Sequence, residues 1–141
     1  MGLDVSHDCW HGAYSAFLRW RHKLAEVAGY EIATIRYDDG WPSEMETIML
    51  DWGHLGTEEH LMGKWDKTPD DPLLVLLVHS DCDGYIYPEQ MEPLARRLEE
   101  LLPLLPKDDD RGHIGNWKNK TQQFIDGLQY AVMKDEVVEF Y

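Results

Sequence analysis

Residues 73–78, with the sequence LLVLLV, are the feature that most constrains how this chain can fold. Six consecutive apolar residues without alternation are typical of a strand that is covered on both faces. We therefore predict a buried strand at 73–78 in a small mixed sheet. The run ends abruptly in the polar sequence HSDCDG at residues 79–84, so a loop follows the predicted strand at once.

Three segments with helical spacing are predicted to pack against this strand. Over residues 12–28 the apolar side chains recur at steps of three and four, which puts them on one face of a helix. A second helix is predicted over 93–102, starting at Pro93 or earlier at Pro88, and a third over 116–133. The helices and the strand are expected to share one core.

The remaining segments are shorter. Strands are predicted at 30–37 and 137–141, and residues 2–5 form a short strand or the entry to the first helix. Residues 47–50 fit either a strand or part of a helix, and 53–71 are predicted to be irregular. Helices and strands are mixed along the chain, so the fold class is α+β or an irregular α/β, in a single domain of 141 residues.

The charge balance and the composition limit the partners and the location of the protein. The chain has 27 Asp and Glu against 13 Lys and Arg, a formal net charge of -14. Such a chain is repelled by phosphate backbones and anionic membranes, so general nucleic-acid binding and membrane association are not expected. No apolar run approaches the roughly 20 residues that span a bilayer, and no secretory signal is visible. Two cysteines are too few for a disulfide framework, which predicts a cytoplasmic protein.

The loop after the predicted strand is similar to the middle of a calcium-binding EF-hand, but its register excludes that motif. With Gly84 at the sixth position, His79 and Gln90 fall at the first and twelfth positions, where calcium needs carboxylates. A loop at the end of a buried strand is nevertheless where α/β folds tend to place ligands. We therefore expect a functional site here, although not a calcium loop.

Within this loop we assign residues to roles by their chemistry. His79 and Asp83 are the candidate catalytic residues because each can hold or release a proton. Ser80 and Gly84 are candidate ligand-binding residues. The alternative is structural: Asp81 and Asp83 would bond backbone amides in an Asx-type turn, with Gly84 at positive φ.

The N-terminal segment SHDCWHGAY, which starts at Ser6, carries a second motif. If a helix begins near His7, then His7 and His11 lie one turn apart on one face, the spacing that suits two imidazole ligands of one ion. Tyr14 would line the same pocket. Alternatively, Ser6 or Asp8 only caps the helix, and the two His side chains are partly exposed.

The two motifs could form one metal site. If the N-terminal segment lies beside the predicted strand, its imidazoles would meet the loop, and the predicted metal ligands are then His7, His11, His79, Asp81 and Asp83. Three imidazoles and two carboxylates suit zinc, manganese or iron better than calcium. The candidate cofactor is therefore a divalent transition metal.

Aromatic side chains are abundant, with six Trp and seven Tyr. We predict that Trp10 and Tyr14 stack on a planar ligand while Arg19 holds its phosphate. Trp20 is expected in the core because it lies on the apolar face of the helix predicted over 12–28. These residues indicate a nucleotide-like ligand.

Two blocks of the chain carry a resemblance to a known family. MGLDVSHDCWHGAYSAFLRWR at the start and DDPLLVLLVHSDCDGYI in the middle resemble sequences in a family of small phage, prophage and bacterial proteins. The likeness covers most of the chain, and the family has no established activity that could be carried over. The resemblance implies a cytoplasmic protein of an infected or lysogenic host cell, dispensable for virion structure, with counter-defence as its candidate role.

Three functions from different classes follow. The first is an accessory protein that binds a small ligand, phosphorylated or nucleotide-like, at the His/Asp-rich site and so sequesters a host defence signal. The second is a metal-dependent hydrolase or phosphodiesterase, in which His79 or Asp83 moves the proton. The third is an acidic module that engages a host protein, with both motifs structural. The first is preferred because no nucleophile with its base and orienting group is visible in the sequence.

Overall fold

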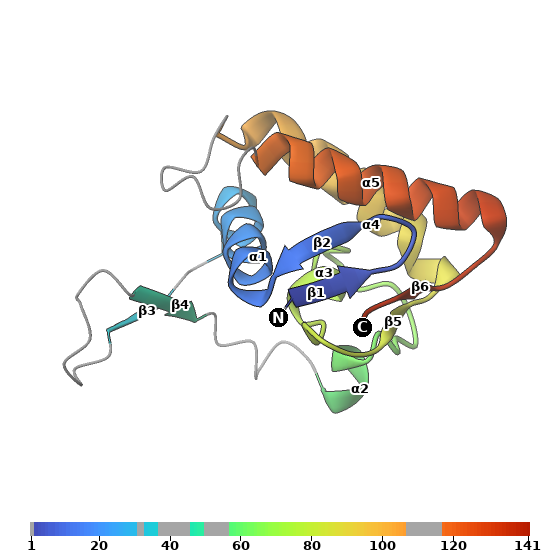
Figure 1. Cartoon of the computed structure of the whole chain (residues 1–141), viewed down its shortest axis with the longest axis horizontal. Helices are drawn as coiled ribbons and strands as arrows, with labels where there is room; N and C mark the ends of the chain where they lie inside the picture. Colours follow the sequence, from blue (N-terminus) through green and yellow to red (C-terminus); the bar gives the residue numbers. More distant parts are fainter. Residues whose placement is uncertain (1, 31–32, 37–45, 50–56, 107–116) are drawn as a thin grey trace.

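The computed structural model describes residues 2–30, 33–36, 46–49, 57–106 and 117–141, which form a mixture of helices and short strands (Figure 1). The α+β class predicted from the sequence is confirmed. No helix within these ranges is long and apolar enough to cross a membrane. The elements in chain order are β1 (Gly2–Val5), β2 (Trp10–Ala13), α1 (Tyr14–Ala28), β3 (Ala33–Arg36), β4 (Glu46–Met49), α2 (Glu58–Leu61), α3 (Leu74–Leu77), β5 (Tyr85–Ile86), α4 (Pro88–Leu101), the 3-10 helix η2 (Leu102–Leu104), α5 (Trp117–Lys134) and β6 (Val138–Glu139).

The three long helices lie where the periodicity predicts them. The helix predicted over 12–28 is α1, and the helix predicted over 116–133 is α5. Of the two possible starts of the second helix, Pro88 is the one used by α4. Proline fits this first position because the N–H that it lacks has no intrahelical partner there. α1 ends at Gly29, whose φ of 95° is the left-handed conformation common at helix ends.

The strands form three antiparallel pairs, β1 with β2, β3 with β4, and β5 with β6. β3 and β6 lie within segments predicted as strands. β1 and β4 resolve the alternatives at 2–5 and 47–50 in favour of strands. The C-terminal segment runs along β1, because the Ser6 N–H donates to the Glu139 carbonyl at 2.8 Å and Val5 forms a bridge with Phe140. The two ends of the chain therefore lie side by side (Figure 1).

The buried strand predicted at 73–78 is wrong, because these residues form the short helix α3. The Leu77 N–H donates to the Leu73 carbonyl at 3.0 Å, and the Val78 N–H donates to the Leu74 carbonyl at 3.0 Å, which is the helical pattern. A run that is apolar on every side fits a helix buried all round as well as a covered strand, so periodicity could not separate them. The predicted burial itself is confirmed for residues 73 and 75–78.

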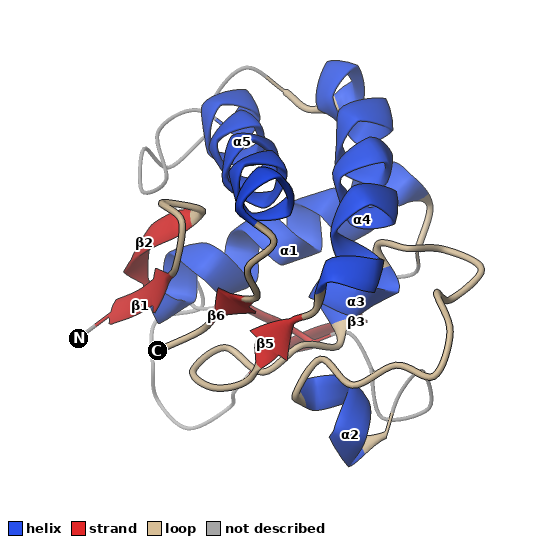
Figure 2. Ribbon diagram, turned by 90° about the vertical axis from the view of Figure 1, so that its right-hand side faces the viewer, coloured by secondary structure: helices blue, strands red, loops and turns tan. Residues whose placement is uncertain are grey.

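The core lies between the long helices and the β1–β2 hairpin, and Figure 2 shows α4 and α5 side by side with α1 behind them. Its centre is aromatic: the Trp20 ring lies 5.1 Å from the Trp10 ring and 5.1 Å from the Phe124 ring, measured between centroids. The Trp20 indole N–H donates to the Thr121 hydroxyl at 2.9 Å, so its polar group is satisfied inside the core. The prediction that Trp20 is a core residue is confirmed.

A buried arginine of α1 holds the end of α3. One Nη atom of Arg21 donates to the carbonyls of Leu76 at 3.3 Å, Leu77 at 3.4 Å and His79 at 2.6 Å. These carbonyls lie at or just after the C-terminus of α3, where few backbone N–H groups are left to pair with them; the Leu76 carbonyl also accepts from the His79 N–H at 3.3 Å. Burial lowers the pKa of Arg21 to about 10, which leaves the guanidinium charged at neutral pH.

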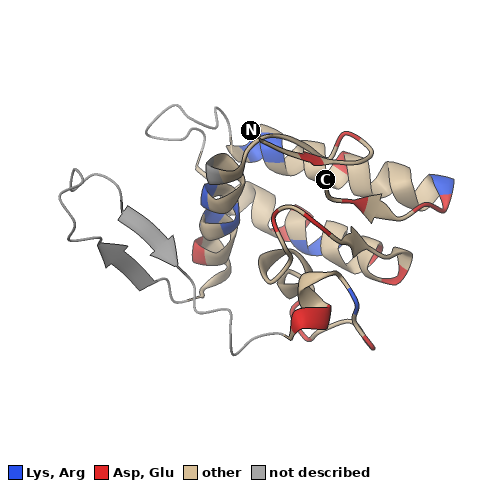
Figure 3. Cartoon of the chain, turned by 60° about the horizontal axis from the view of Figure 1, so that its bottom comes forward, with Lys and Arg blue, Asp and Glu red and all other residues tan. Residues whose placement is uncertain are grey.

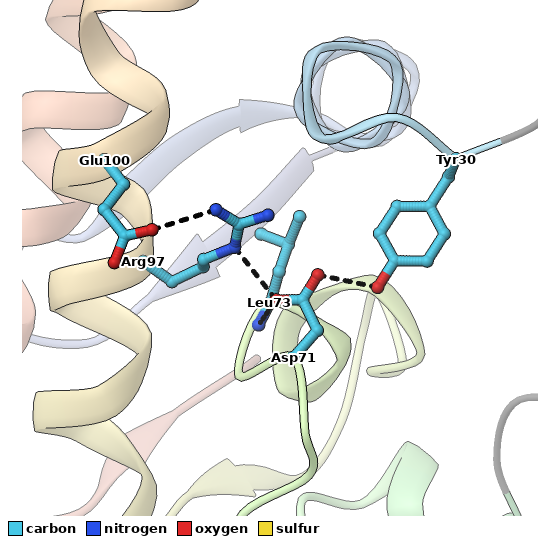
Figure 4. Close-up of polar contacts among 5 residues, drawn as sticks. All are labelled: Tyr30, Asp71, Leu73, Arg97 and Glu100. Carbon is cyan, nitrogen blue, oxygen red and sulfur yellow. Dashed lines mark hydrogen bonds and ion pairs between the residues drawn. The ribbon is translucent and has the colours of Figure 1, made fainter.

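Asp71 joins the end of α1, the start of α3 and α4 in one polar cluster (Figure 4). Its carboxylate accepts hydrogen bonds from the Tyr30 hydroxyl at 2.7 Å, the Leu73 N–H at 3.0 Å and Arg97 Nε at 3.0 Å. Arg97 also donates to Glu100 at 3.0 Å. Burial raises the pKa of Asp71, but the three hydrogen bonds outweigh it, so the pKa lies below its ordinary value.

The loop after α2 approaches β5 so closely that a side chain has no room at Gly63. The Tyr85 N–H donates to the Met62 carbonyl at 3.1 Å, and a Cβ at Gly63 would overlap the Tyr85 carbonyl oxygen. Gly63 also has a φ of 88°, which disfavours any other residue. This contact places the loop that follows α3 against the loop that follows α2.

We expect Gly63→Ala to destabilise the protein by about 3 kcal/mol or more, because the methyl group meets backbone and the φ is strained. Gly29→Ala is the matched control, since Gly29 has a similar φ of 95° but nothing within 4 Å of the added Cβ. That variant should lose about 1 kcal/mol. Urea unfolding followed by circular dichroism measures both. Equal losses in the two variants would contradict the close approach at Gly63.

Candidate functional site

His79, the predicted catalytic and metal-binding residue of the loop, is buried and has both ring nitrogens engaged. Its Nδ1 lies 2.8 Å from the Ser80 carbonyl oxygen and its Nε2 lies 2.9 Å from the Tyr85 carbonyl oxygen. Its ring stacks on Phe140, with 3.9 Å between centroids. Burial lowers the pKa of His79, although the contacts with the Ser80 and Tyr85 carbonyls act to raise it. With these contacts, the ring joins the loop to the C-terminal segment and leaves no nitrogen for a ligand.

The rest of this loop has the geometry of the structural alternative. Asp83 accepts a hydrogen bond from the Gly84 N–H at 2.8 Å, and Gly84 is buried with a φ of 90°. The Ser80 hydroxyl accepts a hydrogen bond from the Cys82 N–H at 3.3 Å. The charge of Asp81 acts on buried Arg21, raising its pKa against the effect of burial. The predicted site residues of the loop therefore shape a turn that leads into β5.

The helix start near His7 on which the paired-imidazole site depended does not occur, because residues 6–9 form the turn of the β1–β2 hairpin. The Cys9 N–H donates to the Ser6 carbonyl at 3.2 Å, and His7 and Asp8 both have a φ of 60°. Non-glycine residues in this region are uncommon and their strain tends to accompany functional sites. His7 and His11 consequently do not share the face of a helix.

The two imidazoles of the hairpin have different partners. His11 lies between two carboxylates, with Nδ1 at 2.7 Å from Asp4 and Nε2 at 2.5 Å from Asp8. His7 contacts the Ser6 hydroxyl through Nδ1 at 2.8 Å and Glu136 through Nε2 at 3.1 Å. Neither imidazole has a nitrogen turned toward the loop that follows α3.

The predicted metal ligands therefore do not converge. His7 and His11 belong to the hairpin with separate partners, His79 is bonded to backbone, and Asp83 bonds its neighbour in the loop. Among the described residues, no three His, Cys, Asp or Glu side chains are placed so that they could hold a metal ion. The shared zinc, manganese or iron site is not formed by the side chains that were predicted to form it.

The residues predicted to bind a planar, phosphorylated ligand, Trp10, Tyr14 and Arg19, are buried to different degrees. Trp10 is fully buried, stacks on Trp20, and has the Lys120 ammonium 5.0 Å from its ring centroid, so no face is left for a ligand. Tyr14 is partly buried and packs against the core. Arg19 is partly buried on α1. None of these three residues is among those that line the pockets described below.

A polar groove of about 510 Å³ lies where the hairpin turn meets α5, and we call it the hairpin groove. Gly127 of α5 makes this approach possible, because a Cβ there would lie 2.9 Å from the His7 carbonyl oxygen and would overlap Cys9. The Gln123 side-chain amide donates to the Asp8 carbonyl at 2.9 Å. Besides Gly127, the groove is lined by His7, Asp8, Asn119, Gln122, Gln123, Asp126 and Tyr130.

The lining of the hairpin groove is acidic and rich in amides. Asp8 and Asp126 supply carboxylates, and no Lys or Arg is among the lining residues. The Lys134 ammonium lies 5.6 Å from the ring centroid of Tyr130, at the edge of this lining. Figure 3 shows Lys and Arg positions on α1, on α4 and at both ends of α5, and none of these residues is among those that line the groove. This charge distribution disfavours a phosphorylated ligand in the groove.

A hydrogen-bonded chain of a hydroxyl, an imidazole and a carboxylate reaches the groove through its middle member, His7, which is one of the lining residues. The Ser6 hydroxyl lies 2.8 Å from His7 Nδ1, and His7 Nε2 lies 3.1 Å from the Glu136 carboxylate. Ser6 also accepts a hydrogen bond from the Glu139 N–H at 2.8 Å. The sequence contained the adjacent Ser6 and His7 as a signal, but Glu136 is 129 residues from His7 in the chain and could not be found by spacing.

Comparisons with known proteins assign neither a family nor a function to this chain. A scan against protein-family models and searches of curated proteins and of solved structures find no match to the chain. The resemblance to phage and prophage proteins stays a prediction.

We expect the pKa of His11 to lie above the ordinary value of 6.5, because its hydrogen bonds with Asp4 and Asp8 favour the imidazolium form. The resulting stabilisation is fully present below pH 6.5 and is lost as the pH rises through the raised pKa. Asp4→Asn and Asp8→Asn should each lower the NMR titration midpoint of His11. Asp126→Asn is the control, since Asp126 does not contact His11. A wild-type midpoint at or below 6.5 would refute the raised pKa.

Proposed function

We propose that this protein binds a small, uncharged, hydroxyl-rich ligand in the hairpin groove. The observation that carries the proposal is the gathering of polar side chains from the hairpin turn and from α5 around one hollow of about 510 Å³. Carboxylates and amides pair readily with neighbouring hydroxyl groups, because they offer acceptors and donors at fixed spacing. Tyr130 adds an aromatic face to the same lining.

The lining is held in place before a ligand arrives. Gln123 is bonded to the Asp8 carbonyl, and His7 is held between Ser6 and Glu136. Groups that are already ordered lose less conformational entropy on binding, so more of the interaction free energy contributes to affinity. These contacts favour a binding site over an incidental surface hollow.

Sequestration of a host signal is the biological role that we propose for this binding, on the basis of the resemblance to phage and prophage proteins. The acidic lining shifts the ligand class from phosphorylated compounds toward uncharged ones, because Asp8 and Asp126 repel phosphate. A sugar or another polyol has the matching chemistry. The protein would act by stoichiometric capture, without turnover.

Gln122→Ala and Asp126→Ala should each weaken binding of a neutral saccharide by about tenfold or more, because each removes hydrogen bonds to the ligand. The measurement is an NMR titration of the α5 backbone amides with a panel of neutral saccharides and nucleoside monophosphates. Gln129→Ala is the matched control, since Gln129 is on α5 but bonds Glu99 away from the groove. A preference for the monophosphates, or equal weakening by Gln129→Ala, would overturn the proposal.

The chain Ser6–His7–Glu136 favours a second candidate function, the hydrolysis of an ester bound in the groove. The Ser6 oxygen would attack the ester carbonyl carbon while His7 Nδ1 takes the hydroxyl proton, and Glu136 would stabilise the imidazolium. The carbon–oxygen bond to the alcohol then breaks, and His7 returns the proton to the departing oxygen. Water repeats the sequence on the acyl-serine and releases the acid. The step requires no metal ligand from the loop after α3.

We expect an alkyl fluorophosphonate to label Ser6, and His7→Gln to slow the labelling by about a hundredfold because the base is lost. Peptide mass spectrometry of the modified protein locates the label. Ser80→Ala is the control, since the Ser80 hydroxyl lies in the turn after α3. Wild-type protein that takes up no label, or a label that persists in Ser6→Ala, would exclude the hydrolase.

A further inference from the structure

A second, smaller pocket lies between the loop that follows α2 and the first turn of α4. Its volume is about 220 Å³, and Trp65, Tyr87 and Gln90 are among its lining residues. We call it the Trp65 pocket. It shares no lining residue with the hairpin groove, so an inference about it stands apart from the proposed function.

Gln90 is the residue that gives this pocket its chemistry. The side chain is 4% exposed, and its Oε1 has no hydrogen-bond partner among the described residues. A buried acceptor left without a partner destabilises the folded protein, so folded proteins keep few of them. The terminal torsion angle of a glutamine side chain is only weakly restricted, so the carboxamide can rotate toward a ligand in the pocket.

Trp65 supplies a second unpaired group to the same pocket. Its indole Nε1–H is buried and has no acceptor in the described part of the chain. The indole ring is fixed by stacking on His60, with 3.7 Å between centroids and 7° between planes. His60 is in turn held at the start of α2, where its Nδ1 accepts from the Thr57 N–H at 3.1 Å. Two residues that line one pocket therefore carry a buried donor and a buried acceptor without partners among the described residues.

We propose that the Trp65 pocket binds an uncharged planar heterocycle with a donor and an acceptor on adjacent atoms, which is the chemistry of a nucleobase. A glutamine carboxamide pairs with such an edge through two parallel hydrogen bonds, as it does with adenine. Trp65 and Tyr87 provide aromatic surfaces for stacking. The lining contains one cation, Lys64, and two carboxylates, Asp66 and Glu89, so its net charge disfavours an attached phosphate.

The test uses the full chain and the free bases adenine and uracil, with their nucleoside monophosphates for comparison. We expect the Trp65 indole N–H resonance to shift on addition of a base, and the monophosphate to bind at least fivefold more weakly. Trp65→Phe assigns the resonance. No shift of this resonance with either base at millimolar concentration would overturn the proposal.

Gln90→Leu separates a ligand role from a structural one. Replacing an unpaired buried amide by an apolar group of similar size should leave the thermal unfolding midpoint unchanged or raise it. Base binding should nevertheless fall by tenfold or more. Gln129→Ala is the control on α5 and should retain base binding. Unchanged base binding in Gln90→Leu would contradict the proposal, whatever the outcome of saccharide binding at the hairpin groove.

Discussion

The buried guanidinium of Arg21 is the interaction on which the arrangement of this fold depends. α3 ends inside the protein, where its last carbonyls have no intrahelical donor and little access to water. Arg21 donates to Leu76, Leu77 and His79, and the nearby charge of Asp81 compensates part of the cost of burying a cation. This contact fixes α3 and the loop after it to α1. His79 can then join that loop to Phe140 at the other end of the chain.

The two candidate sites lie at the margins of this framework, where segments distant in the sequence meet. The hairpin groove forms because Gly127 lets the strained turn at His7 and Asp8 approach α5. The Trp65 pocket forms beside Gly63, where the loop after α2 approaches β5. Both linings carry more carboxylates than cations, in keeping with the formal net charge of -14. Uncharged ligands are what we propose for both sites.

The helices were predictable and the sites were not, for different physical reasons. Amphipathic periodicity is a local property, so α1, α4 and α5 could be placed by the spacing of their apolar residues. The run at 73–78 has no periodicity, because a helix buried on all sides needs none, and the strand prediction failed there. The polar residues of the HSDCDG loop form hydrogen bonds with backbone groups, and the charge of Asp81 favours the charged form of Arg21. Composition cannot distinguish this structural role from ligand binding.

The sequence by itself determined the α+β class and the three long helices, because amphipathic periodicity is a property of the chain alone. Tertiary structure decided which polar residues face one another. His7 gains Glu136 as a hydrogen-bond partner only when the C-terminal segment returns along β1. The His79 ring is not available to a ligand, because Phe140 stacks on it. Hydrogen bonds act over about 3 Å, so residues more than a hundred positions apart become partners through folding alone.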